Sequence, residues 1–182
     1  MRQDSKSDND LMREYSECSF IAYNEIERKY RKNLFNYLIC GLVKDRDDAE
    51  DIVQETMVRI YKSKFTYKPT FMFSTWAYRI CRNLALNFKR DKRTINLDMI
   101  SDNETMEDDN PEFIIDLEKK EVSDKMKKAL ESLDKKYQEI ITLRYLRELS
   151  YEEISEITGI NINTLKSHCK RGIEILRKAM EL

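Results

Sequence analysis

The 182-residue sequence has few of the residues that end helices, with only three glycines and two prolines. Glycine and proline mark turns, whereas the abundant Leu, Ile, Lys and Glu favour helices, so the composition predicts an all-α protein. The single histidine and four widely separated cysteines lack the spacing of a zinc site, and no metal or other cofactor is expected. Cys40, Cys81 and Cys169 lie among apolar helical positions, which predicts buried thiols in a reducing compartment.

Long apolar runs are also lacking. A helix that crosses a bilayer needs roughly 20 apolar residues, and no run approaches that length, so no membrane insertion is expected. Residues 1–10 are polar and lack the apolar centre of a signal peptide. We therefore expect a disordered tail at residues 1–10 and a cytoplasmic protein.

The net charge of −1 conceals a segregation of charge along the chain. Residues 1–97 carry 19 basic and 14 acidic side chains, residues 98–123 carry two and ten, and residues 124–182 carry twelve and ten. This pattern predicts two small helical domains, at residues 11–96 and 123–182, joined by a flexible acidic linker at residues 97–122. Such a linker either occupies a basic channel of a partner protein, in place of nucleic acid, or is a spacer extended by its own charge.

An acidic amphipathic pattern occupies residues 48–61, after a long helical pattern at residues 11–43. Apolar side chains recur there at three- and four-residue spacing, which predicts one buried side: Ile52, Val53, Met57, Ile60 and Tyr61. Asp47 or Asp48 is expected to cap this helix. The outward side is polar, and it is either a docking surface or a solvated face: Asp48, Asp51, Gln54, Glu55 and Arg59.

A second helical run, at residues 71–90, begins with aromatic residues and ends with basic ones. Aromatic rings stack on bases taken out of a duplex, and Lys or Arg beside them neutralise phosphates. Asn side chains such as Asn83 and Asn87 satisfy the hydrogen-bonding edge of an extruded base. The run therefore suggests a surface for single-stranded nucleic acid. The alternative is a core stripe of residues spaced by four: Trp76, Ile80, Leu84 and Phe88.

Residues 149–176 have the pattern of a helix-turn-helix. Ser150 and Glu153 predict a capping box, Gly159 permits a tight turn, and Asn161 is placed to cap the next helix. The expected buried side chains are apolar: Ile154, Ile157, Leu165, Cys169, Ile173 and Leu176. The outward side of the last helix is polar and basic: Asn163, Thr164, Lys166, Ser167, His168, Lys170 and Arg171. The alternative is an αα-hairpin with a solvated face.

Three segments taken together resemble region 2 of the bacterial sigma factors: DAEDIVQET at residues 48–56, FSTW at 73–76 and YRICRNLA at 78–85. The segment LSYEEISEITGI, at residues 149–160, resembles sigma region 4. The chain has no room for the middle domain of the larger primary factors, so it is most similar to the short extracytoplasmic-function (ECF) group of the sigma-70 family.

The resemblance implies a non-enzymatic RNA polymerase sigma factor that directs promoter recognition, DNA melting and transcription initiation. It implies docking of the polar face at 48–59 on the β′ clamp helices of core polymerase, a contact with the β flap, and an anti-sigma partner. The family's minus-10 and melted-strand contacts fall on Lys68, Phe71, Phe73, Ser74, Trp76, Arg79, Arg82, Asn83, Asn87 and Arg90. The outward residues of the last helix correspond to the minus-35 contacts, although the family often has Arg at the position of His168.

The sequence leaves two other classes of function open. A stand-alone helix-turn-helix regulator would use residues 1–95 as a dimerisation or ligand domain and bind DNA without polymerase. An enzyme acting on nucleic acid would need a metal-binding carboxylate cluster, and Asp108 and Asp109 lie in a flexible acidic run that is poorly suited to one. We therefore assign no catalytic residues.

Overall fold

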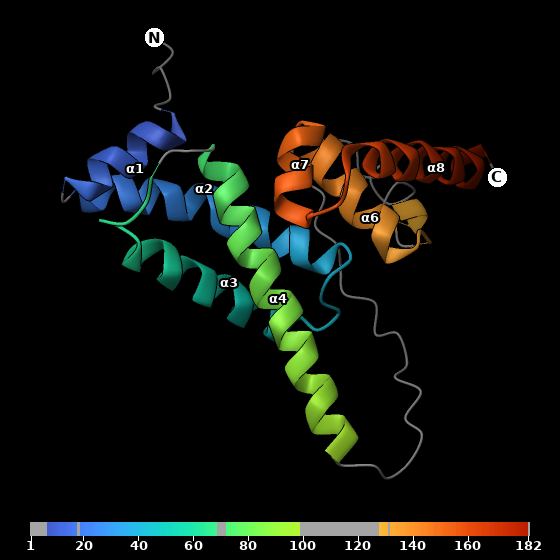
Figure 1. Cartoon of the computed structure of the whole chain (residues 1–182), viewed down its shortest axis with the longest axis horizontal. Coiled ribbons are helices and arrows are strands. Elements are labelled where there is room, and N and C mark those ends of the chain that lie inside the picture. Colours follow the sequence, from blue (N-terminus) through green and yellow to red (C-terminus); the bar gives the residue numbers. More distant parts are fainter. Residues whose placement is uncertain (1–6, 18, 69–71, 99–127, 131, 182) are drawn as a thin grey trace.

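The structure is a computed structural model of the chain that describes residues 7–17, 19–68, 72–98, 128–130 and 132–181. All of the regular elements among these residues are helical, which confirms the all-α prediction (Figure 1). They are α1 (Asp8–Ser16), α2 (Phe20–Ile39), α3 (Arg46–Lys62), α4 (Phe73–Asp98), α6 (Lys135–Ile141), the π-helical turn η1 (Thr142–Leu146), α7 (Tyr151–Thr158) and α8 (Ile162–Glu181). None of the helices in the described ranges is long and apolar enough to cross a membrane. The predicted linker falls almost entirely outside those ranges.

The N-terminal part of the chain contains two helices where one long helical pattern was expected. Ser7 caps α1 by accepting a hydrogen bond from the Asp10 backbone N–H at 3.2 Å. Ser19 caps α2 in the same way through the Ala22 N–H at 3.3 Å. A second cap inside the pattern starts a new helix, so the prediction of one helix was wrong. The predicted disordered tail was also wrong for its last three residues, which form the first turn of α1.

Helix α3 has the predicted amphipathic character with two corrections. Its cap is Asp45, whose carboxylate accepts from the Asp48 N–H at 2.9 Å, and not Asp47 or Asp48. The apolar side of α3 is buried as expected except for Tyr61, which is 45% exposed. Tyr61 lies in the last turn, at the edge of the core, where one part of its ring packs against Tyr15 and Tyr23 with centroid separations of 5.8 and 5.3 Å.

Helix α4 crosses the molecule diagonally in the view of Figure 1, with α1 and α3 on one side, α6–α8 on the other, and α2 passing behind it. Its buried apolar residues are Phe73, Ala77, Tyr78, Cys81 and Ala85, and Thr75 is also buried. The stripe expected from four-residue spacing, beginning at Trp76, lies beside these residues and is only partly buried. Beside the two aromatic residues, the buried side carries the small Ala77, Cys81 and Ala85, and small side chains let neighbouring helices pack closely.

The predicted helix-turn-helix is confirmed in its local details. Ser150 and Glu153 form a complete capping box at the start of α7. Gly159 ends α7 with a left-handed φ of 72°, a conformation that is costly for residues with a Cβ. The Asn161 side chain accepts from the Asn163 N–H at 2.9 Å and so caps α8.

The N-terminal and C-terminal halves share one hydrophobic core. Ile154 and Ile157 of α7 and Leu165 of α8 belong to the same buried cluster as Tyr37 of α2 and Cys81 of α4. Figure 1 shows α7 beside the first half of α4, while the second half of α4 projects away from the other helices. The C-terminal half therefore covers part of α4, which is the helix predicted to bind single-stranded nucleic acid.

Candidate nucleic-acid interface

The predicted single-strand surface begins at an aromatic cluster where the chain enters α4. We define this aromatic cluster as Tyr30, Tyr67, Phe73 and Trp76. The ring centroids of Tyr67 and Trp76 are 4.9 Å apart, and those of Tyr30 and Phe73 are 5.0 Å apart in an edge-to-face arrangement. Such geometries are typical of favourable aromatic pairs.

Within the aromatic cluster, Trp76 and Phe73 differ in their accessibility. Phe73 is only 1% exposed and forms part of the core, so the prediction that its ring contacts a base was wrong. Trp76 is half-buried and keeps part of its ring at the surface, and Ser74 is also half-buried. Lys68 is exposed, whereas Phe71 lies outside the described residues.

The connection between α3 and α4 contains further aromatic residues, which were not among the predicted DNA contacts. Phe65 is 80% exposed, and the Lys64 ammonium lies 5.1 Å from the centroid of its ring. Tyr67 packs on Trp76, as described above. An accessible ring beside a cation is suited to stacking on a base next to a phosphate. The alternation of aromatic and basic residues in KFTYK, at residues 64–68, was the available sequence signal.

One row of predicted residues lies on the outer side of α4. Arg79, Asn83, Asn87 and Arg90 are all exposed. They follow one another at intervals of four, four and three residues, which places them along one face of an α-helix. The structure therefore brings these four together, continuous with the aromatic cluster at the start of the helix.

The same helix is contacted by carboxylates from the C-terminal half. Arg82 Nε donates to Glu139 Oε1 at 2.8 Å, and the Tyr37 hydroxyl donates to the same oxygen at 2.8 Å. Burial alone would lower the pKa of Arg82, but the hydrogen bond and the attraction of Glu139 outweigh burial and raise this pKa. Arg82, predicted to contact DNA, is thus held between the two halves of the protein.

Two further carboxylates of α7 face the first turns of α4. The Thr75 hydroxyl donates to Glu153 Oε1 at 3.1 Å. An ion pair of 3.7 Å joins Arg79 and Glu156, both about half exposed. We call Glu139, Glu153 and Glu156 the bridging carboxylates, since each joins the C-terminal half to α4. Negative groups thus pair with two arginines of α4, Arg79 and Arg82, that were predicted to contact DNA.

The predicted DNA-contacting side of α8 is open to solvent. Its exposed residues are Asn163, Thr164, Lys166, Ser167, Lys170 and Arg171. His168 is the exception, because it is half-buried and its ring packs edge-to-face on Tyr137 at 5.5 Å. The prediction that His168 belongs to the exposed face was therefore wrong. The His168 side chain is turned towards α6, whereas the six exposed side chains are turned towards solvent.

The polar face of α3 is accessible at its centre. Asp51, Gln54 and Glu55 are exposed, and Arg59 donates to Glu55 at 2.9 Å along the helix. Asp48 is instead half-buried and pairs with Lys92 of α4 at 2.6 Å. Three of the five predicted residues therefore form an uninterrupted acidic and amide-bearing surface.

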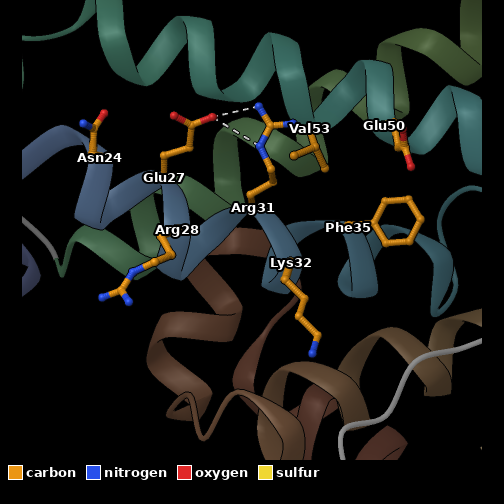
Figure 2. A pocket seen from close by; sticks show the side chains of 8 residues that line it. All are labelled: Asn24, Glu27, Arg28, Arg31, Lys32, Phe35, Glu50 and Val53. Carbon is orange, nitrogen blue, oxygen red and sulfur yellow. Dashed lines mark hydrogen bonds and ion pairs between the residues drawn. The ribbon is translucent and has the colours of Figure 1, made fainter.

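A groove between α2 and α3 was not anticipated from the sequence. It has a volume of about 660 Å³ and is lined by Asn24, Glu27, Arg28, Arg31, Lys32, Phe35, Glu50 and Val53. Figure 2 shows Glu27 and Arg31 turned towards each other, while Arg28 and Lys32 extend to the other side of α2. A second hollow of about 270 Å³ shares Glu27 and Arg31 with the first and includes Gln54. The groove thus adjoins the polar face of α3.

Comparisons with known proteins match both halves of the chain. Residues 21–95 match the family "Sigma-70 region 2", and residues 123–176 match the family "Sigma-70, region 4". RNA polymerase sigma factor SigV of Bacillus subtilis (strain 168) is 33% identical over 147 residues, which cover 80% of this chain and 84% of SigV. The ECF RNA polymerase sigma factor SigW of the same organism is 31% identical and covers 87% of this chain and 89% of SigW.

The fold is also similar to that of a solved sigma factor. The structure of RpoE from Bartonella quintana, in complex with the anti-sigma factor NepR, has a TM-score of 0.62 and is 23% identical. The match covers 88% of this chain and 97% of RpoE. At this identity the similarity concerns the fold alone, and it extends over both halves.

Proposed function

Because this chain belongs to the extracytoplasmic-function group of the sigma-70 family and is an RNA polymerase sigma factor, we propose that its two halves read two separate promoter elements. Helix α8 reads the upstream, minus-35 element, and α4 with the aromatic cluster engages the downstream, minus-10 element. This proposal depends on one observation: on α4, the partly exposed Trp76 is followed directly by the exposed row from Arg79 to Arg90. One helix thereby offers stacking, amide and cationic groups in sequence.

At the upstream element, α8 enters the major groove with its N-terminal residues foremost. Asn163, Thr164 and Lys166 are exposed and read base edges in this proposal, because a recognition helix reads sequence with its first turns. Lys170 and Arg171, one turn later, are also exposed and neutralise phosphates in this proposal. The positive end of the helix dipole also faces the DNA backbone in this orientation.

At the downstream element, α4 holds the melted strand. Trp76, Tyr67 and Phe65 supply aromatic surface for bases that have left the duplex. Asn83 and Asn87 supply paired donors and acceptors for a base edge. Holding the melted strand in this way requires no covalent bond to be made or broken by the chain. The factor is therefore proposed to act by binding and not as an enzyme.

Core RNA polymerase binds through the polar face of α3. Asp51, Gln54 and Glu55 are exposed and meet the β′ clamp helices in this proposal, while the C-terminal half meets the β flap. Complementary charge would orient the encounter and raise its rate. An anti-sigma factor is a further proposed partner, and the factor is expected to work in the cytoplasm beside the polymerase.

The bridging carboxylates and promoter DNA compete for α4. A guanidinium that is held by Glu139 or Glu156 does not at the same time neutralise a phosphate. The observed arrangement is therefore proposed to be the state without promoter, and α7 must leave α4 before the melted strand is bound. Spacing of the two reading helices is then set by core polymerase, which makes binding by the isolated chain weak.

Co-purification with bacterial core RNA polymerase tests this proposal. The wild type is expected to bind, and the triple variant Asp51→Ala/Gln54→Ala/Glu55→Ala is expected to lose binding. A matched control, Glu17→Ala/Glu25→Ala, removes two exposed carboxylates that lie outside α3 and outside the C-terminal half, and it is expected to bind normally.

The competing function, a stand-alone regulator, predicts a dimer that binds DNA tightly without polymerase. If the wild type does not bind core polymerase and instead forms such a dimer, the proposed function is wrong. If both the wild type and the triple variant bind, the function stands and the docking face lies elsewhere.

A further inference from the structure

A side chain from the first turn of α1 holds the entrance of α4. Asn9 Oδ1 accepts one hydrogen bond from the Tyr67 hydroxyl at 3.1 Å and another from the Phe73 backbone N–H at 3.1 Å. The two donors lie on either side of the junction between the α3–α4 connection and α4. One oxygen therefore ties three separate segments together.

The hydrogen bond to Phe73 supplies a helix cap from a distant part of the chain. Phe73 is the first residue of α4, and the first N–H groups of a helix have no partner within it. The preceding residue is Met72, whose side chain is a poor acceptor for a backbone N–H. Asn9 thus performs the function that a local Ser, Thr, Asp or Asn usually performs.

Asn9 is itself held in place by its neighbours on α1. The adjacent Asp8 accepts hydrogen bonds from the Tyr30 hydroxyl and the Lys29 ammonium of α2. Leu11, Met12 and Tyr15 are each at most 4% exposed and anchor α1 in the core. The acceptor at position 9 is therefore fixed from both sides.

The hydrogen bond from the Tyr67 hydroxyl orients a ring of the aromatic cluster. Tyr67 packs on Trp76 with a centroid separation of 4.9 Å, and burial together with the charge of Asp8 raises the pKa of Tyr67. Tyr67 consequently stays protonated and able to donate to Asn9. Release of the Tyr67 hydroxyl would free the ring that lies against Trp76.

From these contacts we propose that Asn9 is a positioning residue for promoter melting. It does not touch DNA, but it holds Tyr67 and the start of α4 so that Trp76 is presented to the melted strand. The match to sigma region 2 begins at residue 21, so α1 lies outside it. The inference adds α1 to the part of the protein that engages the minus-10 element. It rests on the proposed function of α4.

Two substitutions at position 9 isolate the role of the acceptor. Asn9→Leu has a similar size and accepts no hydrogen bond, whereas Asn9→Asp retains an acceptor for both donors. A carboxylate is also favourable at a helix N-terminus. We therefore expect Asn9→Asp to rescue every property that Asn9→Leu loses through this contact.

The first measurement uses the isolated protein and needs neither DNA nor polymerase. Trp76 is the only tryptophan, so its fluorescence reports the aromatic cluster directly. Asn9→Leu is expected to shift the emission to longer wavelength and to increase quenching by acrylamide. Asn9→Asp is expected to match the wild type. Unchanged emission in Asn9→Leu would overturn the proposal.

The second measurement separates promoter melting from promoter binding with the full chain and core polymerase. Closed-complex binding to duplex promoter should be unchanged in Asn9→Leu, while strand opening, followed by permanganate reactivity of unpaired thymines, falls about tenfold. A merely structural role would weaken both steps together. That result, or a failure of Asn9→Asp to restore strand opening, would overturn the proposal.

Tyr67→Phe keeps the test decisive if Asn9→Leu does not fold. This variant retains the ring and the cap on Phe73 but removes one of the two donors, and a decrease in opening of about threefold is expected. Normal opening in Tyr67→Phe would show that the hydroxyl does not position the ring. If the wild type itself does not open a promoter with core polymerase, the proposed function has failed, and the fluorescence result on Asn9 still stands separately.

Discussion

Arg82 of α4 and Glu139 of α6 form an ion pair at 2.8 Å that joins the two halves of the protein. Both side chains are largely buried, with 15% and 9% of their surface exposed. The Tyr37 hydroxyl completes the site by donating to the same carboxylate. A charged contact of this kind is costly to break from one side only, because the remaining charge loses its partner without regaining water.

Glu139→Gln tests how much this contact holds the halves together. The substitution keeps an acceptor but removes the charge that Arg82 faces, so we expect the free energy of unfolding to fall by about 3 kcal/mol. Release of α4 should at the same time strengthen binding to a single-stranded minus-10 oligonucleotide. Urea unfolding and fluorescence anisotropy measure the two effects. Lower stability without stronger binding would argue against competition between Glu139 and DNA.

Glu156→Gln provides the exposed counterpart of that experiment. The pair of Arg79 and Glu156 is longer, at 3.7 Å, and about half exposed on both sides. Exposed ion pairs contribute about 0–1 kcal/mol, so urea unfolding should detect little loss of stability. Binding of the oligonucleotide should rise most clearly at low ionic strength, where an exposed pair is least screened.

Gly172 is a position where the packing of α8 on α6 leaves no room for a side chain. A Cβ there would lie 2.6 Å from Ile141 Cδ1 and 3.3 Å from Tyr137 Cβ. Ile141 is able to rotate, but both neighbours are buried, so Gly172→Ala is expected to destabilise the fold by about 1–3 kcal/mol. The reference is Gly159→Ala, where space is open and only the φ of 72° opposes the Cβ. Thermal unfolding of both variants distinguishes a steric cost from a conformational one.

Local features of the C-terminal half were predictable from the sequence, because they depend on residues close together in the chain. The capping box of Ser150 and Glu153 spans three residues, and the left-handed Gly159 and the Asn161 cap follow within eight more. The same reasoning misplaced the cap of α3. Several aspartates precede that helix, and only the backbone geometry selects Asp45 among them.

Tertiary features escaped prediction where distant segments determine them. Asn9 caps α4 from 64 residues away, and Glu139 reaches Arg82 across 57 residues. No periodicity in the sequence links such positions. Phe73 and His168 were assigned to binding surfaces because their type and spacing fit, but contacts with Tyr30 and Tyr137 place them against other helices. Amphipathic spacing shows that a helix has two faces, and the packing partners decide which one is buried.

The thiol of Cys81 predicts how stability depends on pH. Burial raises the pKa of Cys81 to about 12 from an ordinary value near 9, so between these limits the unfolded thiol ionises while the native thiol stays neutral. The unfolded state then binds fewer protons, and the contribution of Cys81 to stability is complete below pH 9 and decreases as the pH rises. At pH 10 the loss should be roughly 1.4 kcal/mol relative to pH 7.

Cys81→Ala isolates this contribution from those of other titrating groups. We expect the difference in unfolding free energy between wild type and Cys81→Ala to shrink by the same roughly 1.4 kcal/mol between pH 7 and pH 10. Ile60→Val is the control, because Ile60 is fully buried and has no proton to lose, so its effect on stability should not change with pH. Urea unfolding at the two pH values provides both comparisons. A pH-independent effect of Cys81→Ala would mean that the native thiol ionises as readily as the unfolded one, and that burial beside α3 does not protect it.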